Sequence, residues 1–387
     1  MSGSPLRVLS ASLALVLASM LAVPAAAQIE YVAFGDSITE GFGDDAGQRE
    51  RGYPPRLAQL LADRGVNATV TNFGLGGETT AEGLSRIPVV FSQGGDVLLL
   101  MEGTNDIGMR ISPETIRFNL DSMADRAENN GFEVVLATII PRFPTANFDG
   151  SNRITGRLAG LIRELAHDEA RELVDPFQVF FRDTPGVFDE LYVGGGDRLH
   201  PNGEGYDALA EIFADVLTGV DNVPPVTGLV SPEDDDQNVS PNTAIAIDLY
   251  DFGAGIDMAN TSLRINDQLV TANITGDSDK LEIRYQPPAP LSGVVFVGLS
   301  SRDLAAPANN TLDRNIMQFV IAGTQFLPGD IDRDGRVDGT DLVLFAVRFG
   351  SERGDGRFRA FADLNGDDAV DGRDLAILAS NFGGTAS

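Results

Sequence analysis

Apolar positions between residue 29 and about residue 220 alternate between two periods, one typical of short buried strands and one typical of amphipathic helices. The strand-like runs are Ile29–Phe34, Thr69–Phe73, Val97–Met101, Glu133–Ile139 and Leu173–Val174. The helix-like runs are Pro55–Arg64, Thr79–Arg86, Pro113–Asn130, Arg153–Arg171 and Asn202–Leu217. Strands that alternate with helices of this length require crossover connections, so the pattern predicts a parallel sheet between layers of helices.

The pattern changes at residues 221–225, where two consecutive prolines break the periodicity and indicate a linker. Residues 226–322 then contain only strand-like runs, which are Ala244–Leu249, Ser262–Ile265, Leu281–Tyr285, Val294–Leu299 and Ile316–Ile321. Gly, Pro, Asn and Asp separate these runs, a pattern typical of a small β-sandwich. We expect an immunoglobulin-like spacer without a catalytic part, and we interpret its acidic turn, Glu233–Asp236, as a solvated loop.

The N-terminus has the pattern of an export signal. Arg7 is the only charge before the apolar run Val8–Val23, and Pro24–Ala27 ends in a small-x-small cleavage pattern. A membrane anchor is the alternative, but this run is short for a span of about 20 residues and contains serines. We therefore predict a signal peptide at residues 1–27. Because no later stretch approaches membrane length, we expect a soluble protein, secreted or held at the cell surface.

Composition removes several classes of function. The chain carries 57 Asp and Glu against 28 Lys and Arg, a formal charge of -29, which argues against a nucleic-acid partner. It has no cysteine, so disulfides, zinc–thiolate sites and cysteine nucleophiles are excluded. It has two histidines, His167 and His200. Any mechanism that needs an imidazole must use one of them.

Four polar blocks stand where loops from one edge of the predicted sheet can converge. Gly35-Asp36-Ser37, Asn72–Thr79 and Gly103–Asp106 follow the first three strands, and Asp197–Asn202 precedes the last helix. Open parallel sheets place their sites at the carboxyl ends of the strands. Each block alone could be an ordinary turn. Four such blocks in this context are improbable as independent turns and indicate a serine hydrolase.

The four blocks resemble those of the GDSL esterases, also called SGNH hydrolases, in family order over residues 29–218. The resemblance implies an α/β/α, flavodoxin-like hydrolase domain, which we place at residues 28–220. It also implies hydrolysis of carboxylic esters without a catalytic cofactor.

The resemblance carries over to individual residues. It implies that Ser37 is the nucleophile and that His200 and Asp197 complete a catalytic triad. It further implies an oxyanion hole formed by the backbone N–H groups of Ser37 and Gly77 and by the side-chain amide of Asn105. The chemistry is coherent, because a serine hydroxyl needs a base, the base needs an orienting carboxylate, and the tetrahedral oxyanion needs fixed donors.

Two further residues are left with other interpretations. His167 lies among charged residues, including Arg163, in the run Arg153–Arg171, which we interpret as a solvated helix face without a catalytic role. Glu102 stands directly before the third block, where an apolar residue is expected. It either tunes the pocket or points away from it.

The C-terminal region contains a repeat at a spacing of 33 residues (363 minus 330), and each copy has oxygen-bearing side chains at alternate positions of a loop. Calcium takes six to eight such hard ligands. The predicted ligands are Asp330, Asp332, Asp334, Asp338, Asp341, Asp363, Asn365, Asp367, Asp371 and Asp374. An acidic solvated tail is the alternative, but ten of the twelve acidic residues after Leu327 fall within the two 12-residue loops. A helix is predicted after each loop, at Asp341–Gly350 and at Asp374–Gly383.

These duplicated loop–helix units resemble a type I dockerin, which we place at residues 328–387. The resemblance implies two bound Ca²⁺ ions and a cohesin-type partner. The partner-recognition positions hold Gly339-Thr340 and Gly372-Arg373, which are not a matched hydroxyl pair, so the identity of the partner stays open. Asp368 replaces the usual glycine of the second loop, and we expect weaker calcium binding there.

Two classes of function follow from the sequence. The first is an exported esterase that a dockerin tethers, acting on acylated polysaccharide, with lysophospholipids, thioesters or other lipid esters as the alternative substrates. The second is a binding or scaffold component whose hydrolase domain is incidental. A complete triad together with a complete oxyanion set favours the enzyme. The presence of a dockerin beside the hydrolase domain favours a carbohydrate substrate, although this argument rests on association and not on the chemistry of the site.

Overall fold

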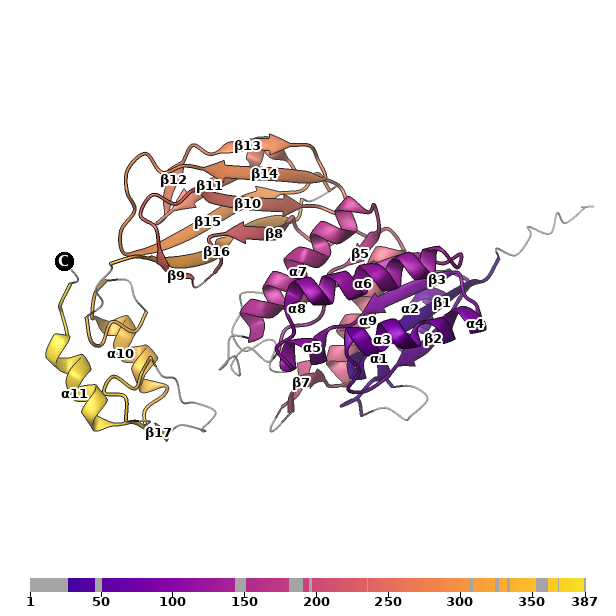
Figure 1. Ribbon diagram of the computed structural model, residues 1–387, viewed down its shortest axis with the longest axis horizontal. Coiled ribbons are helices and arrows are strands. Elements are labelled where there is room, and N and C mark those ends of the chain that lie inside the picture. Colours follow the sequence, from indigo (N-terminus) through magenta and orange to yellow (C-terminus); the bar gives the residue numbers. More distant parts are fainter. Residues whose placement is uncertain are drawn as a thin grey trace, which may run out of the picture.

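The computed structural model describes residues 27–45, 51–142, 151–180, 191–194, 197–234, 236–305, 309–323, 327–332, 335–352, 361–367 and 369–385. The predicted signal peptide, apart from Ala27, lies outside the described residues, as do Asp334 and Asp368. Figure 1 shows an α/β body, a β-sandwich beside it and a small helical module that ends the chain. No helix within these ranges has the length and apolar character needed to cross a membrane.

The α/β body is built on a five-stranded parallel sheet in the order β2-β1-β3-β4-β5. Its strands are β1 (Ile29–Gly35), β2 (Ala68–Gly74), β3 (Val97–Met101), β4 (Glu133–Ala137) and β5 (Glu172–Val174). The predicted parallel sheet is thus present, with β3 buried along its whole length. The strand order reverses between β1 and β3, and the crevice at the carboxyl ends of such a strand pair is where open sheets bind ligands.

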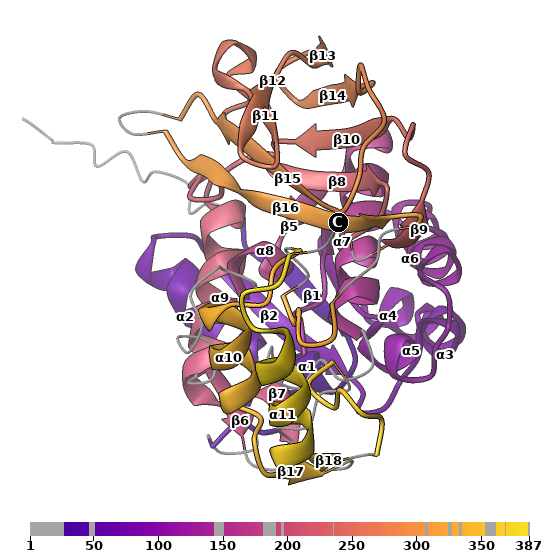
Figure 2. The ribbon, with the colours of Figure 1, turned by 90° about the vertical axis from the view of Figure 1, so that its left-hand side faces the viewer.

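Helices cover both faces of this sheet (Figure 2). The long helices are α2 (Tyr53–Asp63) and α9 (Gly203–Leu217) on one face, and α3 (Thr80–Arg86), α6 (Pro113–Glu128) and α7 (Ser151–Asp168) on the other. The short elements are α1 (Ser37–Glu40), α4 (Pro88–Gln93), α5 (Thr104–Gly108), α8 (Pro176–Phe180) and the hairpin of β6 (Tyr192–Gly194) with β7 (Asp197–Pro201). The predicted long helices are present with shifted ends, whereas α1, α4, α5 and α8 were not predicted.

Helix α9 is held against α2 by stacked rings and by ion pairs. Tyr53 and Phe213 stack with ring centroids 4.5 Å apart, and both rings are fully buried. At the exposed rim of this contact, Arg56 pairs with Asp207 at 2.6 Å. The last helix of the α/β body is therefore fixed to its first long helix.

The β-sandwich consists of two sheets, in the orders β13-β14-β10-β8 and β12-β11-β15-β16-β9. Its elements are β8 (Val226–Ser231), β9 (Asp236–Val239), β10 (Ile245–Tyr250), the 3₁₀ helix η3 (Met258–Asn260), β11 (Ser262–Ile265), β12 (Gln268–Val270), β13 (Asn273–Gly276), β14 (Lys280–Tyr285), β15 (Val294–Arg302) and β16 (Thr311–Ile321). Ile247 and Ile283 of one sheet and Val297 and Phe319 of the other are fully buried in a shared core. Both predicted and unpredicted strands contribute to these sheets.

The sandwich packs on α7, and this corrects the interpretation of that helix as a solvated face (Figure 1). Arg163 is only 3% exposed; its Nε donates to Asp175 Oδ2 at 2.8 Å and its Nη1 donates to Thr227 O of β8 at 2.6 Å. His167 lies 5.3 Å from the Tyr250 ring of β10, measured between centroids. The polar residues of this face are paired across an interface, which a pattern of charges cannot distinguish from solvation.

Two segments that we expected to make no contact between the α/β body and the sandwich, the acidic turn and the linker, lie at this interface. Glu233, expected in a solvated loop, forms ion pairs with Arg153 and Arg157 of α7. In the predicted linker, Asp221 Oδ2 accepts from the backbone N–H of Ala254 at 2.8 Å. The linker and the acidic turn therefore join the sandwich to the α/β body rather than separating the two.

The C-terminal module contains two helices and a short ladder. Its elements are α10 (Gly339–Ala346), β17 (Ser351–Glu352), β18 (Ala369–Val370) and α11 (Gly372–Asn381). A small core includes Val337, Phe345, Val370 and Leu378, each 1% exposed or less. Both helices begin two residues earlier than predicted because Asp338 and Asp371 occupy their N-cap positions.

Candidate active site

Ser37 lies where β1 ends and the single-turn helix α1 begins. The preceding Asp36 caps this helix, and its Oδ1 accepts from the N–H of Ile38 at 2.9 Å. Ser37 is 6% exposed, so its hydroxyl is held in a nearly closed environment. Burial, partly offset by the hydrogen bond from Ile38, raises the pKa of Asp36 to about 6.

The structure brings together Ser37, His200 and Asp197, which the sequence predicted as one constellation. Ser37 Oγ and His200 Nε2 are 2.9 Å apart, and His200 Nδ1 and Asp197 Oδ2 are 2.8 Å apart. Partial burial alone would raise the pKa of Asp197, but hydrogen bonds from the Leu199 N–H and from His200 outweigh it and lower that pKa. Asp197 is thereby kept ionised, as the orienting partner of a histidine base must be.

The hairpin β6–β7 supplies the histidine and its carboxylate. A close approach of backbones places it, since Gly43 has φ +89° and a Cβ there would lie 2.9 Å from Pro201 O. Phe42 lies beside His200 with ring centroids 4.5 Å apart, and it is 52% exposed. The imidazole is therefore bordered by an aromatic ring that faces solvent.

The second and third blocks are joined to each other by hydrogen bonds. Asp106 accepts from the backbone N–H of Thr80 at 2.9 Å and from its hydroxyl at 2.6 Å. Asn105 Nδ2 donates to the backbone oxygen of Glu78 at 2.8 Å. Gly77 adopts φ +80°, a conformation that favours glycine, and a Cβ there would have no atom within 4 Å in the part of the chain that the structure describes. The Gly77 N–H and the Asn105 amide thus lie on two loops that hydrogen bonds hold together.

Three charged residues beside these loops were not assigned a role from the sequence. Glu102, left open between tuning the pocket and pointing away, is 0% exposed and lies inside the body, where burial and then the charge of Glu78 raise its pKa. Arg86 of α3 forms a two-pronged ion pair with Glu78. Glu78 and Arg86 are eight residues apart in the chain, and the bend before α3 brings their side chains together in this ion pair.

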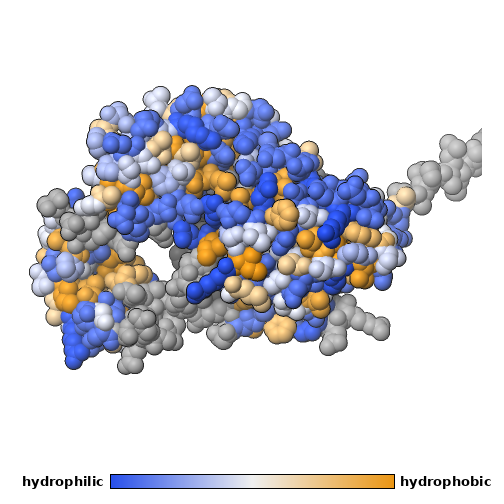
Figure 3. All heavy atoms as spheres, in the orientation of Figure 1, coloured by the Kyte–Doolittle hydropathy of each residue, from blue (hydrophilic) through white to orange (hydrophobic). Residues whose placement is uncertain are grey.

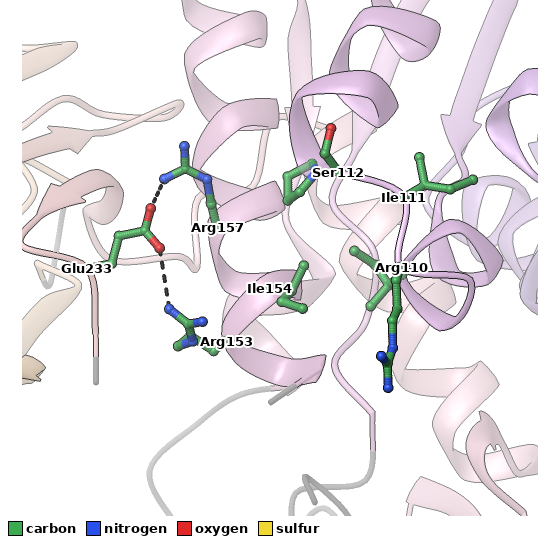
Figure 4. Close-up of a pocket in the computed structure, with 9 residues that line it drawn as sticks. Arg110, Ile111, Ser112, Arg153, Ile154, Arg157 and Glu233 are labelled. Atoms are coloured by element: carbon green, nitrogen blue, oxygen red, sulfur yellow. Dashed lines mark hydrogen bonds and ion pairs between the residues drawn. The ribbon is translucent and has the colours of Figure 1, made fainter. Parts of the chain in front are cut away.

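A cavity of about 320 Å³ lies beside α5, between the α/β body and the sandwich (Figure 4). Its lining includes Ile107, two residues after Asn105, and Ile154 of α7. Arg153 and Arg157 point toward Glu233 on one side, while Arg110 points away from them. The sandwich therefore borders the surface next to the loops of the candidate active site.

Each C-terminal loop brings three of its predicted ligands together. Carboxylate oxygens lie within 4.8 Å of one another in two groups: Asp330, Asp332 and Asp341, and Asp363, Asp367 and Asp374. Asp341 and Asp374 are fully buried. Convergent carboxylates form the hard-oxygen donor set that suits Ca²⁺. The residues present therefore fit this ion.

The remaining predicted ligands are placed differently. Asp338 and Asp371 accept from the backbone N–H groups of Thr340 and Arg373 and cap the two helices. Asn365 Nδ2 donates to Asp367 Oδ2 at 3.1 Å, and Arg373 pairs with the same Asp367 at 3.0 Å. Asp334 lies outside the described residues.

Comparison with known proteins gives two family matches. Residues 33–208 match the model of the GDSL-like lipase/acylhydrolase family, and residues 328–382 match the type I dockerin domain. Esterase TesA of Pseudomonas aeruginosa is 37% identical over 155 residues, which are 39% of this chain and 73% of that protein. An arylesterase of Vibrio mimicus is 30% identical over 207 residues, 53% of this chain and 96% of that protein. A solved structure from Veillonella parvula, a member of the lipolytic protein G-D-S-L family, is 22% identical, covers 50% of this chain and 99% of its own, and has a TM-score of 0.43.

Proposed function

The chain belongs to the GDSL-like lipase/acylhydrolase family, carries a type I dockerin domain and hydrolyses carboxylic esters, and from this premise we propose that Ser37, His200 and Asp197 are its catalytic triad. The observation that carries the proposal is the continuous hydrogen-bonded path from Ser37 Oγ through His200 to Asp197, with distances of 2.9 Å and 2.8 Å.

In this mechanism Ser37 Oγ attacks the carbonyl carbon of the ester while His200 Nε2 accepts the hydroxyl proton. The oxyanion of the tetrahedral intermediate accepts hydrogen bonds from the N–H groups of Ser37 and Gly77 and from the Asn105 amide. The intermediate collapses to an acyl-enzyme as His200 returns the proton to the departing alkoxide, so that an alcohol leaves. His200 then deprotonates a water that attacks the acyl carbon. When this second tetrahedral intermediate collapses, His200 returns the proton to Ser37 Oγ, which frees the serine and releases the acid.

The Ser37→Ala variant tests this mechanism. It removes a single hydroxyl at the first residue of α1, so ester hydrolysis should be abolished while the circular dichroism spectrum and Tm stay those of wild type. Activity near the wild-type value in a folded Ser37→Ala protein would exclude the triad.

For the substrate we propose acyl groups on polysaccharide. The exposed Phe42 ring beside His200 supports this, because an aromatic face packs well on the apolar face of a sugar ring. A dockerin tether would also keep the enzyme beside other enzymes that act on the same polymer. The runner-up is a lipid ester, such as a lysophospholipid or thioester. Rates on acetylated xylan, lysophospholipid and p-nitrophenyl acetate, compared at equal enzyme concentration, decide between the two.

For the C-terminal module we propose that each loop holds one Ca²⁺ through its converging carboxylates, and that the module binds a cohesin. Bound calcium would neutralise carboxylates that otherwise repel one another. Large apolar side chains remain exposed on this module, among them Val343, Val347, Phe349 and Phe382. On the face drawn in Figure 3, hydrophobic residues gather on the module, while hydrophilic residues predominate over the sandwich. Exposed apolar sets of this kind mark protein-binding surfaces.

We further propose the division into a signal peptide (1–27), hydrolase domain (28–220), linker (221–225), sandwich (226–322) and dockerin (328–387), and export of the mature chain. N-terminal sequencing of the protein recovered from culture medium tests the cleavage. A mature N-terminus at Gln28 supports the proposal, and an intact Met1 contradicts it.

A further inference from the structure

Glu102 is a buried carboxyl group that no hydrogen-bond donor of the described residues reaches. It is 0% exposed, and neither Oε1 nor Oε2 accepts a hydrogen bond from an N–H or O–H group within those ranges. The carboxyl group of Glu78, which is itself 4% exposed, faces it. Two carboxyl groups can share a hydrogen bond only if one of them carries a proton.

The charged neighbours of Glu102 show which of the two carries it. Arg86 Nε donates to Glu78 Oε1 at 2.6 Å and Arg86 Nη2 donates to Glu78 Oε2, so this guanidinium is bound to Glu78. The same guanidinium packs over the Phe34 ring at 4.0 Å. The other charged group facing Glu102 is Asp36, between β1 and α1. Burial, followed by repulsion from Glu78 and Asp36, raises the pKa of Glu102 well above its ordinary value.

The helix above Glu102 leaves room for this carboxyl group. Gly83 of α3 faces it, and a Cβ at that position would lie 2.3 Å from Glu102 Oε2. A larger residue at position 83 would therefore displace the Glu102 carboxyl from its place. The position of this carboxyl thus depends on a glycine in α3.

Glu78 connects Glu102 to the proposed oxyanion donors. It directly follows Gly77, and its backbone oxygen accepts from the Asn105 amide at 2.8 Å. A shift of Glu78 therefore moves both the Gly77 N–H and the acceptor that orients Asn105. Oxyanion donors lower the barrier only when they are already in place before the charge develops.

We propose that Glu102 is a positioning residue of this esterase: as a neutral carboxylic acid it donates its proton to Glu78 and so fixes the Gly77–Glu78 segment for oxyanion binding. The inference rests on the proposed roles of Gly77 and Asn105. Loss of the proton leaves two carboxylates facing each other, so they separate and the donors lose alignment. Because the raised pKa belongs to a group required in its acid form, its contribution is complete at lower pH and is lost as the pH rises through that pKa.

The test measures kcat and KM of the full chain on p-nitrophenyl acetate from neutral to alkaline pH, corrected for uncatalysed hydrolysis. In Glu102→Gln a neutral N–H donor still faces Glu78, so we expect kcat within about threefold of wild type and no alkaline decline. Glu102→Leu keeps the volume without a donor, so kcat should fall about tenfold with KM nearly unchanged. Glu133→Gln, an exposed site at the start of β4, is the matched control and should follow wild type, alkaline decline included.

A wild-type kcat in Glu102→Leu, or an alkaline decline that is equal in wild type and Glu102→Gln, overturns the proposal. If Glu102→Leu does not fold, the pH profile of Glu102→Gln decides alone. Asn105→Ala separates this inference from the mechanism on which it rests. If Asn105→Ala keeps its kcat, the oxyanion assignment fails; if it loses kcat while Glu102→Leu does not, only the role of Glu102 fails.

Discussion

Replacing Arg163 should destabilise the protein far more than replacing Arg153 on the same helix. Arg163 is 3% exposed and bridges two parts of the chain, with Asp175 on one side and the Thr227 carbonyl of the sandwich on the other. The side chain of Arg153 is 43% exposed and lies 3.5 Å from Glu233. The two substitutions to methionine thus compare a buried charge with a solvated one.

The magnitude follows from what Arg163→Met leaves behind. Asp175 stays buried, and its other partners among the described residues are the Thr138 hydroxyl (2.7 Å) and the Gln178 N–H (3.2 Å). Removing one partner of a buried pair costs about 3–5 kcal/mol, whereas an exposed pair is worth about 0–1 kcal/mol. In a domain of about 200 residues, each kcal/mol lowers Tm by about 2–4 °C, so Arg163→Met should lower it by about 6–20 °C.

Residual esterase activity after graded heating, together with circular dichroism, measures the difference. The double variant Arg163→Met/Asp175→Asn removes the stranded charge and should recover at least about 1 kcal/mol relative to Arg163→Met alone, because the two side chains are in contact. A loss below about 1 kcal/mol in Arg163→Met, or an equal loss in Arg153→Met, would refute the reasoning.

Four further expectations concern catalysis, pH and metal. Asn105→Ala should lower kcat about 100- to 1,000-fold on p-nitrophenyl acetate, and a loss confined to KM would instead make it a binding residue. His167→Ala should leave kcat within about twofold of wild type, since His167 lies against the sandwich; a large loss of kcat would contradict the assignment of His200 as the base. Asp36 holds its proton up to a pKa of about 6 in the folded state against an ordinary value of 3.8, so its contribution to stability is complete below pH 3.8 and lost by about pH 6. Asp36→Asn should therefore flatten the dependence of Tm on pH across that window, and an unchanged slope would contradict the assignment. Chelation should unfold residues 328–384 while activity on soluble ester persists, and circular dichroism spectra that match in chelator and in millimolar calcium would show that the loops are not calcium sites.

The sequence predicted those parts of the fold that local pattern controls. Strands such as Val97–Met101 are short apolar runs between turn residues, so their length and burial follow from periodicity. The four polar blocks were found because each lies at an element end. Ser37, Asn105 and His200 could be grouped from their blocks before any distance was known.

What the sequence could not predict depends on partners distant in the chain. Arg163 is separated from Thr227 by 64 residues, and nothing in the pattern of α7 indicates that a sandwich covers it. In the sequence, Glu102 is a charged residue at a position where an apolar one is expected. Its neighbour Glu78 is identified only from the fold, because 24 residues (102 minus 78) separate the two in the chain. Strand β12 is mostly exposed and too short to show alternation, so it carries no periodic signal. Local pattern gives elements and blocks, whereas pairing across the fold has to be observed.

The packing of α9 on α2 determines when, during synthesis of the chain, the proposed triad becomes complete. Ser37, Gly77 and Asn105 all lie within the first 106 residues, but the histidine arrives on a hairpin that α9 follows. A chain that emerges N-terminus first therefore presents a nucleophile without a base until residues 203–217 have docked on Tyr53 and Arg56. A nascent or truncated chain that ends before His200 has no imidazole at Ser37 and cannot hydrolyse an ester by the proposed mechanism. Because α9 is synthesised and docks last, we expect ester hydrolysis only from the completely folded hydrolase domain.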